Sequence, residues 1–325
     1  MSWQPIVSYG LLGLLVFGLS ASVDVVAFKK KLENKNGILI GLGCQFFLLP
    51  FVGYLTVVAF GLKEVYGISL LIVCSSPGGS YSNLWCSLFN ADLALSVAMT
   101  TASTIVAAVM LPVNLLLYIS LLYNESGAHE HLNWAALFTS IGVVIAAVGS
   151  GLGVSSYASE QVQGRCALGG NFAGLALILF SAWISSRDEP VWDKPGLFYV
   201  AVATPCVSAL LLAFALTSIP SCGLAKPERV SVAIETCYQN VGVATAVSLS
   251  MFKGKEKAQA VGVPLYYGFV EAVLLAVFCL VAWKSGWTLA PSSADDVLGL
   301  SKNQNQHQHQ QGNNDEEEEE EGAVT

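Results

Sequence analysis

Long apolar stretches, separated by short polar segments, follow one another along most of this chain. Counting about 20 apolar residues per bilayer crossing, the pattern predicts nine membrane helices, at 5–28, 37–60, 65–90, 92–121, 132–157, 163–185, 194–218, 226–252 and 258–284. With 54% hydrophobic and only 12% charged residues over 325 positions, a soluble core could not bury this much apolar surface. We therefore predict an all-α polytopic membrane protein.

Two of these stretches are interrupted at mid-depth. The stretch 65–90 contains Pro77-Gly78-Gly79-Ser80-Tyr81-Ser82-Asn83, and the stretch 226–252 contains Glu235-Thr236-Cys237-Tyr238-Gln239-Asn240. Backbone released from helical hydrogen bonding at bilayer depth is tolerated only where protein or a water-filled cavity satisfies it. One such break in each half of the chain indicates a secondary transporter with its site between the breaks. The alternative is that these glycines and prolines are ordinary residues of membrane helices.

The order of intact and broken helices occurs twice. The second to fourth predicted helices are intact, broken and intact, and the seventh to ninth repeat that order from the opposite side of the membrane. This is the pattern of inverted repeats whose unwound segments cross near the midplane.

The charge distribution predicts the orientation. Lys29, Lys30, Lys31 and Lys35 follow the first helix, and basic loops are typically cytoplasmic, which places the N-terminus outside and the C-terminus in the cytoplasm. The chain begins without an Arg/Ser-rich leader, which favours the plasma membrane. The sequon Asn124-Glu125-Ser126 then lies in an external loop.

The segment 285–325 has a different composition. It is rich in Gln, His and Glu and holds most of the excess negative charge of a chain whose net charge is -8. We expect a disordered acidic cytoplasmic tail, and net charge therefore does not indicate what is transported. Seven of the eight cysteines lie in apolar stretches, where they are typical packing residues, so no disulfide is required.

Glu235 is the charge that most requires an explanation, since an unpaired carboxylate deep in an apolar span is costly. A bound cation would compensate it. The sequence offers hard oxygen donors near the breaks, which suit alkali ions better than zinc or copper, and sodium is the natural candidate. The donors are Thr236, Gln239, Ser82, Asn83, Ser96 and Thr100. Ser96 and Thr100 share one helix face, although such residues often serve only helix packing.

Three further polar residues have competing interpretations. Gln45, taken alone, is expected to form an interhelical hydrogen bond. Asp24 can reach the interface beside the nearby lysines. Glu271 is either a structural partner or a secondary functional residue.

Each break also exposes the N-terminus of a half-helix, near 80–82 in one repeat and near 240–242 in the other. Free backbone N–H groups at such ends attract anions. We therefore expect an organic anion as substrate rather than an organic cation.

Several of these residues resemble the motifs of the bile acid:sodium symporter family. The runs that carry the resemblance are Cys74–Asn83 with Asp92–Thr104, and Glu235–Asn240 as the second signature. The resemblance extends from about Leu11 to Ala282, in order and in spacing. Tyr238 departs from the small or unbranched residue common at its position.

The resemblance implies a core domain and a panel domain. The panel would contain helix 1 (1–28) and the helices of 126–190; the core would contain repeats 29–125 and 191–284. It also implies two sodium sites: one from Ser82, Asn83, Ser96, Thr100 and Glu235, and a second from Gln45, Glu235 and Gln239 with the carbonyls of Thr236 and Tyr238. Gly79, Ser80, Tyr81 and Asn240 would face the substrate.

These inferences predict a sodium-coupled symporter of organic anions, of the bile acid, steroid sulfate or small carboxylate class, that works by alternating access. It is not expected to be an enzyme, to need a cofactor besides the coupling sodium ions, or to bind nucleic acid. A proton-coupled or exchange carrier of the same fold, and a membrane receptor without transport, are the alternatives. Substrate identity and oligomeric state stay open.

Overall fold

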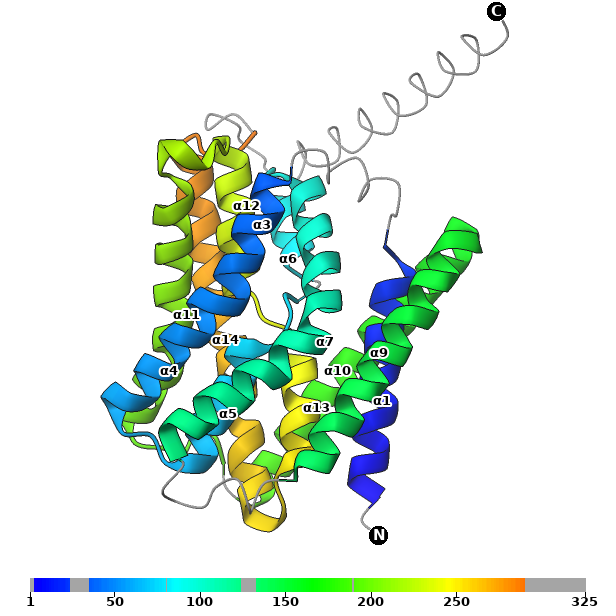
Figure 1. Cartoon of the computed structure of the whole chain (residues 1–325), viewed down its shortest axis with the longest axis vertical. Helices are drawn as coiled ribbons and strands as arrows, with labels where there is room; N and C mark the ends of the chain where they lie inside the picture. The colour runs from blue at the N-terminus through cyan, green and yellow to red at the C-terminus, as the bar shows by residue number, and fades with distance from the viewer. Residues whose placement is uncertain (1–2, 24–34, 80, 124–132, 189, 290–325) are drawn as a thin grey trace, which may run out of the picture.

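The computed structural model describes residues 3–23, 35–79, 81–123, 133–188 and 190–289, and this part of the chain is helical apart from short connections (Figure 1). The elements are α1 (Trp3–Ala21), α3 (Asn36–Gly43), the π-helix η2 (Cys44–Leu48), α4 (Leu49–Phe60), α5 (Glu64–Ser75), α6 (Ser82–Leu88), α7 (Leu93–Tyr123), α9 (Trp134–Tyr157), α10 (Glu160–Asp188), α11 (Gly196–Thr217), the 3-10 helix η3 (Pro220–Cys222), α12 (Lys226–Cys237), α13 (Val241–Met251) and α14 (Gly254–Lys284). The predictions for Ser80, Asp24, the Asn124 sequon and most of the acidic tail lie outside the described residues.

Within the described ranges, six helices are long and apolar enough to cross a membrane. The most apolar 18-residue windows of these helices have mean hydropathies of 1.7 to 2.4, and only 28 to 50% of each window is buried inside the protein. Most of this apolar surface therefore remains for contact with lipid. The prediction of an all-helical, multi-pass integral membrane protein is confirmed at this level.

Helices α1, α9 and α10 form one bundle, which lies to one side of the molecule in Figure 1. Glycines let these helices approach closely: a Cβ at Gly18 would clash with the backbone of Cys166 and Gly170, and one at Gly151 would lie 2.6 Å from the Ser20 Cβ. Small residues at helix contacts are typical of packing in membranes. This bundle contacts the remaining helices through α7, α13 and α14.

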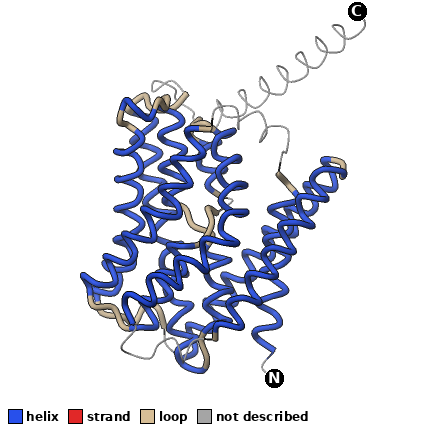
Figure 2. The backbone as a smooth tube through the Cα atoms, viewed as in Figure 1, coloured by secondary structure: helices blue, strands red, loops and turns tan. Residues whose placement is uncertain are grey.

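The remaining helices surround two helix breaks that meet in the middle of the protein. Gly79 N donates to Tyr238 O at 3.0 Å and Asn240 N to Pro77 O at 2.9 Å, so that Gly78 and Gln239 form an antiparallel bridge. The tan connections at the centre of Figure 2 are these segments. Each break thus supplies hydrogen-bond partners for backbone groups of the other, as burial at bilayer depth requires.

The halves of the broken helices pair crosswise. Helix α5 contacts α13, and α6 contacts α12 (Figure 1). Ser76, before Pro77, has the extended backbone that a residue preceding proline prefers, with ψ of 159°.

The second break is shorter than the sequence predicts. We expected the interruption to begin at Glu235, but α12 continues through Cys237 and only residues 238–240 are unwound. Polar side chains do not by themselves end a helix, because its hydrogen bonds are made by the backbone. The next helix starts where Asn240 caps it by accepting from Val243 N. Ser82 and Asn83 likewise begin α6 and do not belong to the first break.

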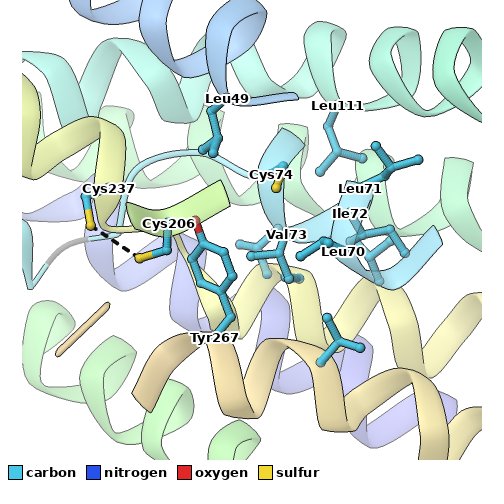
Figure 3. Close-up of a cluster of buried hydrophobic side chains, with 14 of the residues drawn as sticks. Leu49, Leu70, Leu71, Ile72, Val73, Cys74, Leu111, Cys206, Cys237 and Tyr267 are labelled. Carbon is cyan, nitrogen blue, oxygen red and sulfur yellow. Dashed lines mark hydrogen bonds between the residues drawn. The ribbon is translucent and has the colours of Figure 1, made fainter. Parts of the chain in front are cut away.

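Helix α5 passes through the centre of the hydrophobic core. Every residue from Gly67 to Ser75 is buried, which fits a helix that is apolar on all sides. Figure 3 shows part of this core with Leu49, Leu111 and Tyr267 around it. All eight cysteines are free thiols, and the Sγ atoms of Cys206 and Cys237 lie 3.4 Å apart.

Candidate functional site

The carboxylate of Glu235 lies at the crossing of the two breaks, in the last turn of α12, and the residue is 1% exposed. Three hydroxyl groups contact it: Ser82 Oγ at 2.6 Å from Oε1, Ser96 Oγ at 2.5 Å from Oε1, and Thr100 Oγ1 at 3.0 and 3.1 Å from the two oxygens. No lysine or arginine of the described ranges forms an ion pair with it. The negative charge is therefore surrounded by neutral oxygen atoms.

This first cluster, made of Glu235, Ser82, Asn83, Ser96 and Thr100, has more acceptor oxygens than hydroxyl protons. Its three hydroxyls reach five acceptor oxygens: both Glu235 oxygens, Asn83 Oδ1, and the carbonyls of Gly79 and Ser96. Each hydroxyl carries one proton and two acceptor lone pairs. An acceptor-rich cluster with a net negative charge is the arrangement that a hard cation binds.

Helix α7 supplies much of this geometry. Ser96 and Thr100 are one turn apart and point to the same side, and one turn further Ser103 Oγ accepts a hydrogen bond from Gly78 N at 3.2 Å. Gly78 leaves no room for a side chain, because a Cβ there would lie 2.8 Å from Glu235 Oε2. The structure thus brings together all five residues that the sequence assigned to a first sodium site.

A second cluster is formed by Gln45 and Gln239. Gln45 Nε2 donates to Gln239 Oε1 at 2.7 Å and to Ser76 O at 2.8 Å, while Gln239 Nε2 donates to Thr236 O at 2.9 Å and lies 3.4 Å from Gln45 Oε1. Four N–H groups thus meet four acceptors. This cluster is neutral and balanced, and no hydrogen bond within the described residues joins either glutamine to the Glu235 carboxylate.

The remaining predicted ligands of the second site are occupied. The carbonyl of Thr236, which is the predicted ligand, accepts from Gln239 Nε2 at 2.9 Å, and the hydroxyl of Thr236 donates to Val232 O at 2.8 Å within its own helix. The Tyr238 carbonyl accepts from Gly79 N as part of the bridge between the breaks.

The predicted substrate residues Gly79, Tyr81 and Asn240 line one cavity. The other side of this cavity is formed by the α1–α9–α10 bundle, with Leu15 from α1 and Asn171 from α10. The sequence analysis did not single out Asn171, although a carboxamide within the apolar span 163–185 was a usable signal. The cavity lies at the N-terminus of α13, where backbone N–H groups favour an anion.

The sequence left open whether Glu271 is structural or functional, and the structure shows a hydrogen bond to the backbone of the second break. The residue is 0% exposed, and its Oε2 accepts a hydrogen bond from Gln239 N at 2.9 Å. Oε1 has no hydrogen-bond partner among the described residues. Glu271 therefore supports the backbone of the second break next to the glutamine pair.

Comparison with known families agrees with this geometry. The model of the sodium bile acid symporter family matches residues 10–183, which is more than half of the chain. The chain belongs to this family. Its members are symporters, which are transporters rather than enzymes.

Three relatives illustrate the similarity. The human sodium-dependent organic anion transporter is 28% identical over 285 residues, covering 85% of this chain and 72% of that protein. The human ileal sodium/bile acid cotransporter is 28% identical over 270 residues, covering 82% and 76%. The rat sodium-dependent organic anion transporter is 29% identical over 286 residues, covering 86% and 75%. The similarity extends across both breaks and is not confined to a single motif.

Proposed function

We propose that this protein is a sodium-coupled symporter of organic anions. The observation that carries the proposal is the first cluster, in which a buried carboxylate is contacted by three hydroxyl groups and forms no ion pair with a lysine or arginine of the described residues. Sodium would supply the missing positive charge. The names of the relatives, sodium-dependent organic anion transporter and sodium/bile acid cotransporter, support the same choice.

The two clusters would differ in how they bind sodium. The first requires little rearrangement, since its oxygens already converge around Glu235. At the second, Gln45 and Gln239 must first give up the hydrogen bonds between them before their oxygens can face an ion. Sodium binding at the second site would therefore be coupled to a local change of the breaks.

The substrate would bind in the cavity between the breaks and the α1–α9–α10 bundle. Asn240 and the N-terminus of α13 would bind the anionic group, and apolar residues such as Leu15 would contact the rest of the molecule. Bile acids, steroid sulfates and smaller carboxylates all have this combination of one anionic group and an apolar body.

Alternating access would follow from motion between two domains. The bundle of residues 1–28 and 126–190 would be the panel, and residues 29–125 and 191–284 the core. The six long helices, α1 and the two broken helices would make nine crossings. The crosswise contacts of α5 with α13 and of α6 with α12 support an inverted repeat.

A second cavity supports a path for sodium on one side of the membrane. It is lined by Asn83 and Thr100 of the first cluster and, across from them, by Ser20, Ser22 and Leu152 of the panel. Movement of the panel would open or close it. With the N-terminus outside, residues 285–325 would be cytoplasmic, and we assign the protein to the plasma membrane.

The function is tested by uptake of labelled anions in cells that express the protein, with sodium in the medium or replaced by choline. The labelled anions tested should include a bile acid, a steroid sulfate and a small carboxylate. We expect at least one of them to be taken up only with sodium. Uptake driven by a pH gradient without sodium would identify a proton-coupled or exchange carrier, and binding without uptake would identify a receptor.

A further inference from the structure

The second residue of helix α4 is a proline that alters the backbone hydrogen bonding beside the second cluster. This proline is Pro50, and α4 follows directly on the π-helix of residues 44–48 that contains Gln45. In a regular helix, residue 50 would donate its N–H to the carbonyl four residues earlier, that of Phe46. Proline has no N–H. The carbonyl of Phe46, next to Gln45, therefore has no donor at the four-residue spacing of an α-helix, although the π-turn itself has five-residue spacing, as Leu49 N to Cys44 O shows.

Asn114 of α7 supplies a donor from outside this helix. Its Nδ2 donates to Phe46 O at 3.0 Å, and the residue is buried, with an exposed fraction of 4%. Helix α7 contacts the π-helix directly. A buried carbonyl without a partner is costly, so this hydrogen bond stabilises the irregular turn in the position where the structure has it.

The consequence concerns Gln45. Its side chain reaches Gln239 and Ser76 O across 194 and 31 residues of sequence, and both contacts require that the π-turn present the carboxamide toward the breaks. π-Turns within α-helices often occur at functional positions. Here Asn114 is the external contact that replaces the hydrogen bond removed by Pro50.

We propose that Asn114 is a positioning residue for Gln45 and thereby sets the sodium affinity of the second cluster. This inference rests on the proposed sodium-coupled transport. It also links the two clusters, because α7 carries Ser96 and Thr100 of the first and Asn114, which supports the second.

The test measures how anion uptake depends on sodium concentration in wild type, Asn114→Leu, Pro50→Ala and the double variant. Asn114→Leu should raise the sodium concentration for half-maximal uptake roughly threefold, within the range expected from one lost buried hydrogen bond and less than the loss of Gln45 itself, with the substrate KM at saturating sodium unchanged. Pro50→Ala gives the helix its own donor for Phe46 O. The double variant should therefore return to the sodium dependence of Pro50→Ala alone.

Thr56→Val, in the same helix α4 as Pro50, is the matched control. Thr56 is similarly buried, but its hydroxyl donates to Val52 O within α4 and makes no hydrogen bond to another helix among the described residues. Its sodium dependence should match wild type. If Asn114→Leu does not reach the membrane, Asn114→Ser, whose hydroxyl is too short to reach Phe46 O, is measured instead with the same expectation.

The outcomes separate the inference from the function on which it rests. Wild-type uptake that does not depend on sodium overturns the proposed function. Sodium-dependent wild-type uptake together with an unshifted Asn114 variant overturns only the positioning role. A shift that Pro50→Ala fails to remove overturns it as well, since the proline would then not be the reason that Asn114 is needed.

Discussion

The two clusters at the helix breaks differ in net charge and in the balance between hydrogen-bond donors and acceptors. Around Glu235, three hydroxyl protons serve five acceptors and the group carries a negative charge. Between Gln45 and Gln239, four N–H groups serve four acceptors and the group is neutral. On the proposed function, a bound cation would stabilise the first cluster, whereas the second would lose internal hydrogen bonds to bind one.

This difference predicts an order of binding. Sodium should bind first where charge attracts it, and the second ion should bind only in a conformation in which the glutamines have separated. A ligand shifts a conformational equilibrium only through its different affinity for the two states. We therefore expect the balanced cluster to have the larger part in coupling sodium to conformation, and the charged cluster the larger part in sodium affinity.

The largest effect is expected from Glu235→Gln. The amide removes the charge and brings N–H donors toward a cation that needs acceptors, so sodium-dependent uptake should fall by about 100-fold or more, as for a buried charge that loses its compensation. Uptake is measured against the amount of protein at the cell surface. Glu228→Gln, which changes a half-buried acid at the start of α12 whose oxygen accepts from Ala225 N, is the control and should retain uptake.

Next in size is Gly78→Ala. The added Cβ would lie 2.8 Å from Glu235 Oε2, so the carboxylate must move away from its hydroxyl partners. We expect the sodium concentration for half-maximal uptake to rise by about tenfold, equivalent to about 1.4 kcal/mol. Gly153→Ala, where the new Cβ meets no atom within 4 Å, is the matched control. Equal sodium dependence of both variants would contradict the geometry of the first cluster.

Gln45→Leu separates the clusters. It removes one half of the glutamine pair without contact to the Glu235 carboxylate, so the first site should keep its affinity while the second is lost. The Hill coefficient for sodium should fall toward one, and half-maximal sodium should rise by roughly fivefold, the value of about one hydrogen bond. A double variant with Gln239→Leu should add little, because the two residues act as a pair.

The smallest effect is expected from Glu271→Gln. The amide oxygen can still accept from Gln239 N, as Oε2 does at 2.9 Å, so uptake and sodium dependence should stay within about threefold of wild type. Glu271→Leu removes the acceptor and should reduce uptake more than Glu271→Gln does. If the two variants are equally impaired, the carboxylate has a role beyond supporting the break.

The sequence predicted the fold well because its signals are local. Apolar length identified the long helices, and Pro77 with two glycines in an apolar stretch identified the first break. Glu235 attracted attention because a charge at that depth needs compensation. The four-residue spacing of Ser96 and Thr100 placed both on one helix face, where the structure has them.

The rest depends on tertiary contacts that a linear pattern does not contain. The end of α12 is decided by backbone capping at Asn240 rather than by the first polar residue. The hydrogen bond between Gln45 and Gln239 joins residues 194 positions apart. Likewise, the partner of Glu271 is a backbone N–H and that of Asn114 is a backbone carbonyl, and nearly every residue type offers both groups.

The most direct test of the central claim is the movement of sodium itself. Purified protein in sealed vesicles is given radioactive sodium outside, with and without an unlabelled organic anion that it transports, at equal pH on both sides. The account predicts that the anion stimulates sodium uptake in wild type and not in Glu235→Gln. Anion uptake in wild type without any accompanying sodium would contradict the assignment of the Glu235 cluster as a coupling site.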